Sequence, residues 1–94
     1  MNKNIVITGA TKGLGLAIAK RFANNGFDVA LCARSASDLK TVHSVLKDLN
    51  ANSGQKILTI QCDISKKDAL KAFANQVLEA FGTVDILVNN GGIF

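Results

Sequence analysis

Residues 4–15 read Asn4-Ile5-Val6-Ile7-Thr8-Gly9-Ala10-Thr11-Lys12-Gly13-Leu14-Gly15, an apolar run that passes directly into a glycine-rich turn. The continuous β-branched run at 4–7 predicts a strand that is covered on both faces. A helix is predicted to begin near Gly13 and to end at Asn25-Gly26, because small and apolar residues recur on one helical face. These residues are Gly15, Ile18, Ala19 and Phe22.

The glycines at this junction, Gly9, Gly13 and Gly15, allow a tight turn and a close approach of the backbone to a ligand. The unpaired amides of the first helical turn, aided by the helix dipole, would then face an anion. The order of strand, turn and helix therefore predicts a phosphate cradle of the kind that binds a dinucleotide. The alternative is that the glycines only shape a turn.

The rest of the chain repeats this alternation, with strands predicted at 28–33, 56–62 and 84–89. The two stretches between these strands have apolar residues at helical spacing. The predicted buried positions are Leu39, Val42, Leu46 and Leu49 in one, and Leu70, Phe73, Ala74, Val77, Leu78 and Phe81 in the other. Such alternation is typical of an α/β fold with a parallel sheet.

Both of these helices have start and stop signals. Ser35 with Asp38, and Ser65 with Asp68, have the spacing of capping boxes. The stop signals are the run at 52–54 for the earlier helix and Gly82 for the later one.

Two motifs together give the chain a family resemblance. The spacing G-x-x-x-G-x-G, with Thr8 ahead of it, resembles the glycine motif of the short-chain dehydrogenase/reductase family. The stretch Val84-Asp85-Ile86-Leu87-Val88-Asn89-Asn90-Gly91-Gly92 resembles the family's Asn-Asn-Ala-Gly motif after its fourth strand, with Gly91 where Ala is usual.

The resemblance implies a Rossmann-type, doubly wound parallel sheet with strand order 3-2-1-4. It also implies that residues 1–94 form the cofactor-binding portion of a single domain and stop before its catalytic half. The two glycine motifs would then border the same crevice, at the carboxyl ends of the first and fourth strands. Thr8 is expected to tie the first glycine turn to Asn89 and Asn90.

The end of the second strand predicts the cofactor. Enzymes that prefer NAD usually have a carboxylate there for the adenosine ribose, whereas this chain has Arg34 followed by Ser35. Arg34 and Lys12 would place two positive charges about a 2′-phosphate, so NADP is favoured. The alternative is that both are ordinary surface cations.

Other cofactor contacts follow from the resemblance. Asp63 corresponds to the residue that contacts the adenine amino group, with Ile64 packed beside the ring, and Asn90 and Gly91 would line the ribose and adenine walls. An aspartate that only forms a turn before Ser65 is the alternative for Asp63. The full predicted cofactor site is Gly9, Thr11, Lys12, Gly13, Leu14, Gly15, Arg34, Ser35, Asp63, Ile64, Asn90 and Gly91.

By resemblance, the function is an NADP-dependent oxidoreductase that transfers a hydride between NADPH and a carbonyl or alcohol substrate. The family's catalytic Ser and Tyr-x-x-x-Lys would lie beyond Phe94, and the 94 residues contain no Tyr. No catalytic residue is therefore assigned within this chain. The alternative is a dinucleotide-binding or sensor module without chemistry. A fold for another nucleotide, such as a methyl donor, is disfavoured by Arg34.

Composition excludes other classes of partner. The net charge of +4 comes from dispersed lysines without aromatic stacking residues, so no nucleic acid is expected as a partner. Cys32 and Cys62 lack metal-ligand spacing, and buried thiols are expected rather than a metal site or a disulfide. No apolar run suits a signal peptide or a membrane span, which predicts a cytoplasmic protein. The resemblance further implies a homo-oligomer acting on a small molecule.

Overall fold

Strands and helices alternate through the parts of the chain that the computed structural model describes, residues 2–9, 12–49 and 54–90. In chain order these elements are β1 (Asn4–Thr8), α1 (Gly13–Asn24), β2 (Asp28–Ala33), α2 (Ala36–Leu49), β3 (Ile57–Gln61), α3 (Lys67–Phe81) and β4 (Ile86–Asn89). Within those parts, no helix is long and apolar enough to cross a membrane.

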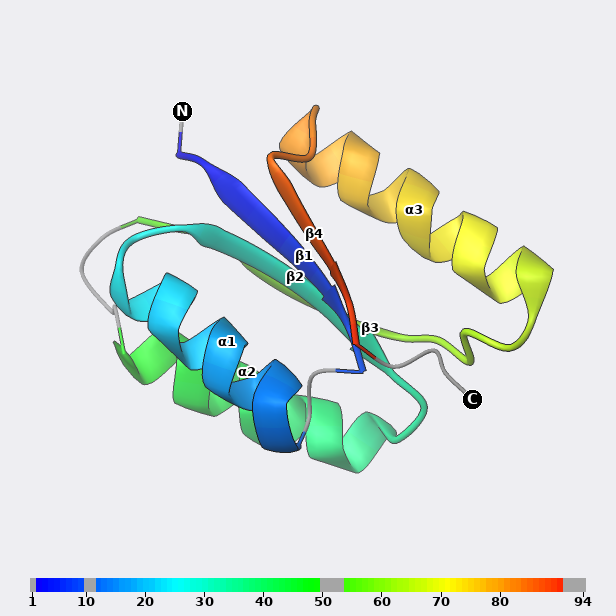
Figure 1. The fold of residues 1–94 in the computed structure, drawn as a ribbon, viewed down its shortest axis with the longest axis horizontal. Coiled ribbons are helices and arrows are strands. Elements are labelled where there is room, and N and C mark those ends of the chain that lie inside the picture. The colour runs from blue at the N-terminus through cyan, green and yellow to red at the C-terminus, as the bar shows by residue number, and fades with distance from the viewer. Residues whose placement is uncertain (1, 10–11, 50–53, 91–94) are drawn as a thin grey trace.

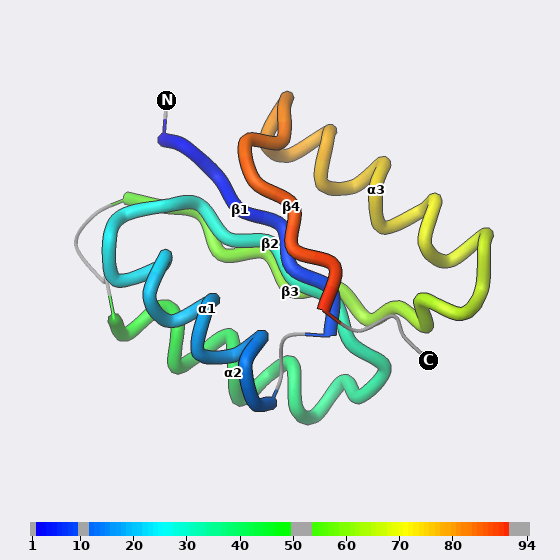
Figure 2. The backbone as a smooth tube through the Cα atoms, in the orientation of Figure 1, coloured from blue at the N-terminus to red at the C-terminus, as the bar shows by residue number. Residues whose placement is uncertain are grey.

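The strands form one parallel sheet in the order β3-β2-β1-β4, as the sequence predicts. Helices α1 and α2 lie on one face of this sheet and α3 lies on the other (Figure 1). The first three strands are added in one direction across the sheet, and α3 then leads the chain back to the other side of β1, where β4 pairs (Figure 2). The strand order therefore reverses between β1 and β4. This is the switch point at which open α/β sheets bind ligands.

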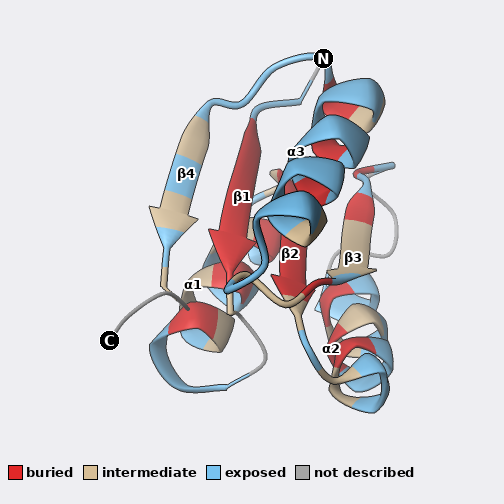
Figure 3. Cartoon of the chain, turned by 90° about the vertical axis from the view of Figure 1, so that its right-hand side faces the viewer, coloured by how far each residue is buried: buried red, intermediate tan, exposed pale blue. Residues whose placement is uncertain are grey.

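The core lies on both faces of the two central strands, β1 and β2 (Figure 3). Because side chains alternate across a strand, Ile5 and Ile7 pack with α1 and α2, whereas Val6 packs with the α3 residues Phe73 and Val77. The continuous β-branched run thus fills two separate hydrophobic clusters.

The α3 helix buries a narrower face than the sequence predicts. Phe73, Val77 and Phe81 are buried at i, i+4, i+8 spacing, but Leu70 and Leu78 are 40% and 49% exposed, and Ala74 is also exposed. The reason is that α3 lies alone on its face among the described elements, so only the stripe against the sheet is covered (Figure 1). Leu49, predicted to be buried, is likewise 39% exposed at the end of α2.

One predicted capping box is confirmed in its main contact and the other is wrong. The Ser35 hydroxyl accepts a hydrogen bond from the Asp38 amide at 3.2 Å, at the start of α2. At α3, however, the N-cap residue is Lys66, which makes no side-chain cap hydrogen bond. Ser65 lies one residue too early to cap this helix, and its hydroxyl donates to Asp63 instead. Gly82 ends α3 in a left-handed conformation, as predicted, whereas the predicted stop of α2 at 52–54 falls mostly outside the described residues.

A reciprocal contact joins the amino ends of β1 and β4. The backbone amide of Asn4 donates to Asp85 Oδ2 at 2.8 Å, and the backbone amide of Asp85 donates to Asn4 Oδ1 at 3.1 Å. The Asn4 side chain also donates to the carbonyl of Thr83 at 2.9 Å. These contacts fix the start of β4 against β1 although 81 residues separate the two.

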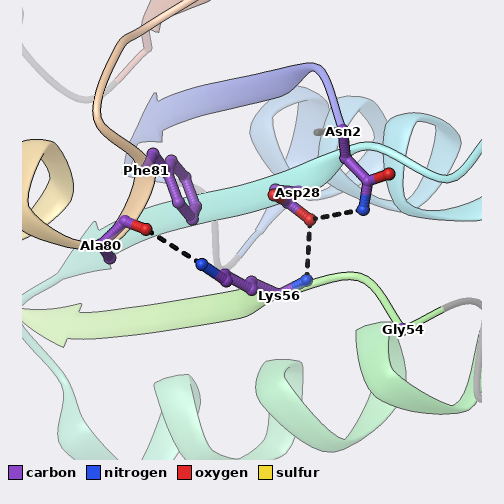
Figure 4. A pocket seen from close by; sticks show the side chains of 6 residues that line it. All are labelled: Asn2, Asp28, Gly54, Lys56, Ala80 and Phe81. Atoms are coloured by element: carbon purple, nitrogen blue, oxygen red, sulfur yellow. Dashed lines mark hydrogen bonds between the residues drawn. The ribbon is translucent and has the colours of Figure 1, made fainter.

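A second polar cluster joins the amino ends of β2 and β3 (Figure 4). The buried Asp28 carboxylate accepts from Asn2 Nδ2 at 3.1 Å and from the Lys56 amide at 2.8 Å, while Lys56 Nζ donates to the carbonyl of Ala80. These residues line a cavity of about 270 Å³. It lies at the opposite end of the strands from the glycine turn.

We expect Asp85→Ala to lower the free energy of unfolding by about 1 to 3 kcal/mol, because it leaves the buried Asn4 amide without its carboxylate acceptor. The matched variant Asp85→Asn retains an acceptor oxygen and should lose less. Urea denaturation of the protein measures both values. Equal stability of the two variants would contradict the role assigned to this contact.

Candidate functional site

The carboxyl ends of β1 and β4 meet through a small hydrogen-bonded network. Thr8 and Asn89 are register partners, and the Thr8 hydroxyl donates to Asn89 Oδ1 at 3.1 Å. The same hydroxyl accepts from the Asn90 amide at 3.0 Å, and Asn90 Nδ2 donates to the carbonyl of Gly9 at 3.0 Å. The predicted tie between the two glycine motifs is therefore confirmed.

The turn after β1 begins with a glycine that no other residue would replace without strain. Gly9 has φ of 68°, in the left-handed region, and its amide donates to the carbonyl of Cys32 at 2.9 Å. The turn is thereby held beside the end of β2. Thr11, a predicted site residue, lies outside the described residues.

The start of α1 presents backbone amides rather than a side-chain cap. Lys12 is the N-cap residue in an extended conformation, and its side chain makes no cap hydrogen bond. Its carbonyl accepts the first helical bond from Leu16, so the amides of Gly13, Leu14 and Gly15 precede the intrahelical ladder. The first turn also has no acidic side chain. This arrangement attracts an anion.

The end of β2 brings Arg34 and Ser35 to the same edge of the sheet. Arg34 is exposed and directly follows the strand, two residues after Cys32, whose carbonyl binds the Gly9 amide. Within the described parts of the chain, no carboxylate forms an ion pair with its guanidinium. Ser35 caps α2 and lies 3.2 Å from the Ser37 hydroxyl. A cation is therefore available where many dinucleotide sites have an acid.

The end of β3 contributes Asp63, whose carboxylate is organised by Ser65. Asp63 Oδ1 accepts from the Ser65 hydroxyl at 2.6 Å and from the Ser65 amide at 3.0 Å. These two hydrogen bonds, with smaller effects from the charges of Arg34 and Lys66, lower the pKa of Asp63. Ile64 packs against the α3 side of the core. The turn geometry and the predicted adenine contact are compatible, since Oδ2 has no part in these bonds.

The described site residues thus gather at the carboxyl ends of four strands. Gly91 lies outside the described residues, next to Asn90. One further residue was not predicted: Gln61, at the end of β3, donates from Nε2 to the carbonyl of Arg34 at 2.9 Å. No sequence pattern marks such a contact, because it joins a side chain to a backbone group 27 residues away.

The two cysteines are core residues. Both are free and buried, as predicted. The structure adds that they belong to the cluster on the α3 face. Burial, and then the neighbouring Cys62, raise the pKa of the Cys32 thiol to about 12. A thiol with such a pKa is protonated at neutral pH and is not a nucleophile.

We expect Ser65→Ala to raise the pKa of Asp63 towards its ordinary value, because the variant removes the hydroxyl donor and keeps only the amide. A lowered pKa in the folded state stabilises the fold above the unfolded-state pKa, and this contribution is lost as pH falls through the folded-state pKa. The variant should therefore lose less stability on acidification. Carboxyl ¹³C titration by NMR measures the shift, with the exposed Ser44→Ala as control. An unchanged Asp63 titration in Ser65→Ala would refute this assignment.

Known proteins are similar to this chain in both sequence and fold. A 3-oxoacyl-[acyl-carrier-protein] reductase of Staphylococcus epidermidis is 37% identical over 93 residues, which are 99% of this chain and 37% of that protein. The crystal structure of L-sorbose reductase from Gluconobacter frateurii, complexed with NADPH and L-sorbose, is 37% identical with a TM-score of 0.87. The match covers 98% of this chain and 34% of that one.

A third similar structure is an NAD⁺-bound xylitol dehydrogenase, 28% identical with a TM-score of 0.86, covering 97% of this chain and 34% of the other. The chain thus spans about a third of the length of these relatives. Residues 3–94 of this chain match the sequence model of the short chain dehydrogenase family. On this match, and with a parallel sheet in the order β3-β2-β1-β4, the chain belongs to the short chain dehydrogenase family.

Proposed function

We propose that this chain binds NADP(H) and forms the cofactor-binding part of an oxidoreductase acting on a carbonyl or alcohol substrate. The observation that carries the proposal is the charge at the end of β2, where Arg34 stands in place of a carboxylate beside the glycine turn. This part of the protein would hold the cofactor in position and provide the positive charge that faces its phosphates. The nicotinamide ring, when bound, supplies or accepts the hydride.

The pyrophosphate would lie on the first turn of α1. The amides of Gly13, Leu14 and Gly15 precede the helical ladder, and no acidic side chain in this turn opposes an anion. Gly9 would let the backbone approach the phosphates, and Thr11, two residues later in the sequence, remains a predicted contact.

The adenosine half would lie across the ends of β2 and β3. The Arg34 fork and the Ser35 hydroxyl would bind the 2′-phosphate, with Lys12 adding charge from the glycine turn. Asp63 would accept from the adenine amino group, and Ile64 would pack beside the ring. The geometry of the Asp63 turn supports this role, because both hydrogen bonds from Ser65 are made to Oδ1 and Oδ2 takes no part in them.

The nicotinamide half would extend towards β4. Asn90 is held by Thr8 and Gly9, so its position depends on the pairing of β1 with β4. Gly91 would line the adenine-side wall, and Asn90 would line the nicotinamide-side ribose. This contact would orient the ring towards a substrate held by other parts of the protein.

Proton transfer would need groups that residues 1–94 do not contain. The family's Ser and Tyr-x-x-x-Lys have no counterpart here, and the sequence holds no Tyr. We propose that the remainder of the protein supplies them. The homo-oligomer and the cytoplasmic location are likewise predictions. A full-length protein that bound NADPH but turned over no carbonyl would favour a non-catalytic binding module.

The relatives support a nicotinamide dinucleotide and leave room for either form of it, since one similar structure holds NADPH and another holds NAD⁺. The choice of NADP(H) therefore depends on this chain's own residues. A charge-assisted contact to phosphate at a half-open site contributes about 1.5 to 3 kcal/mol before solvent reduces it, or roughly a 10- to 100-fold preference.

We expect Arg34→Ala in the whole protein to raise the Kd for NADPH by about 10- to 100-fold and to change the Kd for NADH less than about twofold. The control is Arg21→Ala, which removes the chain's other arginine, exposed on α1. Isothermal titration with both cofactors measures these constants. Equal affinity of the unmodified protein for NADPH and NADH would refute the proposed cofactor preference.

A further inference from the structure

The contact between Gln61 and Arg34 joins the end of β3 to the predicted 2′-phosphate site at the end of β2. Gln61 is the last residue of β3 and is the register partner of Ala33, the last residue of β2. Its side chain reaches one residue further along the neighbouring strand, where Nε2 donates to the Arg34 carbonyl at 2.9 Å. A side chain of the edge strand therefore holds the backbone from which the arginine projects.

The backbone around Arg34 is hydrogen-bonded at each successive carbonyl. The Ala33 carbonyl accepts from the Cys62 amide at 2.9 Å, and the Ser35 carbonyl accepts from the Leu39 amide at 3.1 Å. Both of these bonds are backbone to backbone. The Arg34 carbonyl between them accepts from the Gln61 side chain, so this one restraint can be removed without disturbing the neighbouring two.

This restraint bears on phosphate recognition because an arginine side chain is long and exposed here. Binding must order its rotamers, and a backbone that also turned about Arg34 would add to that cost. Holding the carbonyl restricts rotation of the peptide group after Arg34, and this narrows the directions that the Cα–Cβ bond can take. The guanidinium then samples a smaller region at the end of β2, where the Gly9 amide is bonded to the Cys32 carbonyl two residues before Arg34.

Charge on the same edge makes this direction matter. Asp63 follows β3 two residues after Gln61, and the positive charge of Arg34 is close enough to lower the pKa of Asp63. An arginine turned further towards that carboxylate would be partly neutralised and less able to bind a phosphate. Ser65 already satisfies Asp63 Oδ1, which leaves the arginine available if its backbone is held.

We propose that Gln61 is a positioning residue for NADP(H) selectivity, whose amide holds the Arg34 backbone so that the guanidinium is directed to the 2′-phosphate. This inference rests on the proposed function. The hydrogen bond is exposed to solvent, so its contribution is that of a single neutral bond. Its loss should change affinity by about 3- to 10-fold, which is smaller than the effect of removing Arg34 itself.

The test is Gln61→Met in the whole protein, since methionine is similar in length and cannot donate. The matched control is Gln76→Met, which makes the same change at an exposed position of α3, on the opposite face of the sheet. Titration calorimetry with NADPH and with NADH gives two dissociation constants for each variant, which are compared with the two constants of the unmodified protein. We expect the Kd for NADPH to rise about 3- to 10-fold in Gln61→Met, with NADH affinity and both constants of the control changed less than about twofold.

A double variant separates positioning from direct contact. In the Arg34→Ala background, Gln61→Met should have no further effect on NADPH affinity, because the residue it positions is gone. An effect that persists there, or equal weakening of NADPH and NADH, would overturn the inference and assign Gln61 to a direct or general role. No change in NADPH affinity in the single variant would also overturn it.

These results are distinguishable from failure of the proposed function. If the unmodified protein preferred NADPH and lost this preference with Arg34→Ala but not with Gln61→Met, only the positioning role would be wrong. If the unmodified protein showed no preference, or none that depended on Arg34, both the proposed cofactor choice and this inference would fall. Retained NADH binding shows in each variant that the fold is intact.

Discussion

The parallel pairing of β1 with β4 is the constraint on which the site depends. These strands are 81 residues apart in sequence at their bonded ends, and polar contacts fix them at both ends. Asn4 and Asp85 hold the amino ends, and Thr8 holds Asn89 and Asn90 at the carboxyl ends. Because the register is fixed, Gly9 and Asn90 lie side by side at the carboxyl ends of β1 and β4.

The proposed cofactor selectivity depends on the other neighbour of β1, the strand β2. The Gly9 amide binds the Cys32 carbonyl, which sets the start of the glycine turn beside the end of β2, two residues before Arg34. Polar groups of β3 and its following turn then complete this edge, through Gln61 and Asp63. Backbone amides attract a phosphate in general, while the side chains at this edge, Arg34 first among them, are the groups that we propose to discriminate between phosphate and hydroxyl.

Most of the fold could be predicted because local signals agree with the global order. The β-branched run at 4–7, the glycines at 9 and 13 and the cap at Ser35 each depend on neighbours in sequence. The wrong predictions arise where a side chain binds a different partner from the expected one, or where no described element covers an apolar side chain. Ser65 binds Asp63 rather than capping α3, and Leu70 and Leu78 are exposed because no described helix covers them. Gln61 escaped prediction because its partner is a backbone carbonyl on another strand.

The most direct measurement of the central claim is a crystal structure of the whole protein with NADP⁺ bound. We expect the pyrophosphate to lie on the amides of residues 13–15 at the start of α1. The 2′-phosphate should lie within hydrogen-bond distance of the Arg34 guanidinium, and the nicotinamide ribose should lie beside Asn90. A dinucleotide bound away from the crevice between β1 and β4, or an adenosine ribose directed away from Arg34, would contradict the account.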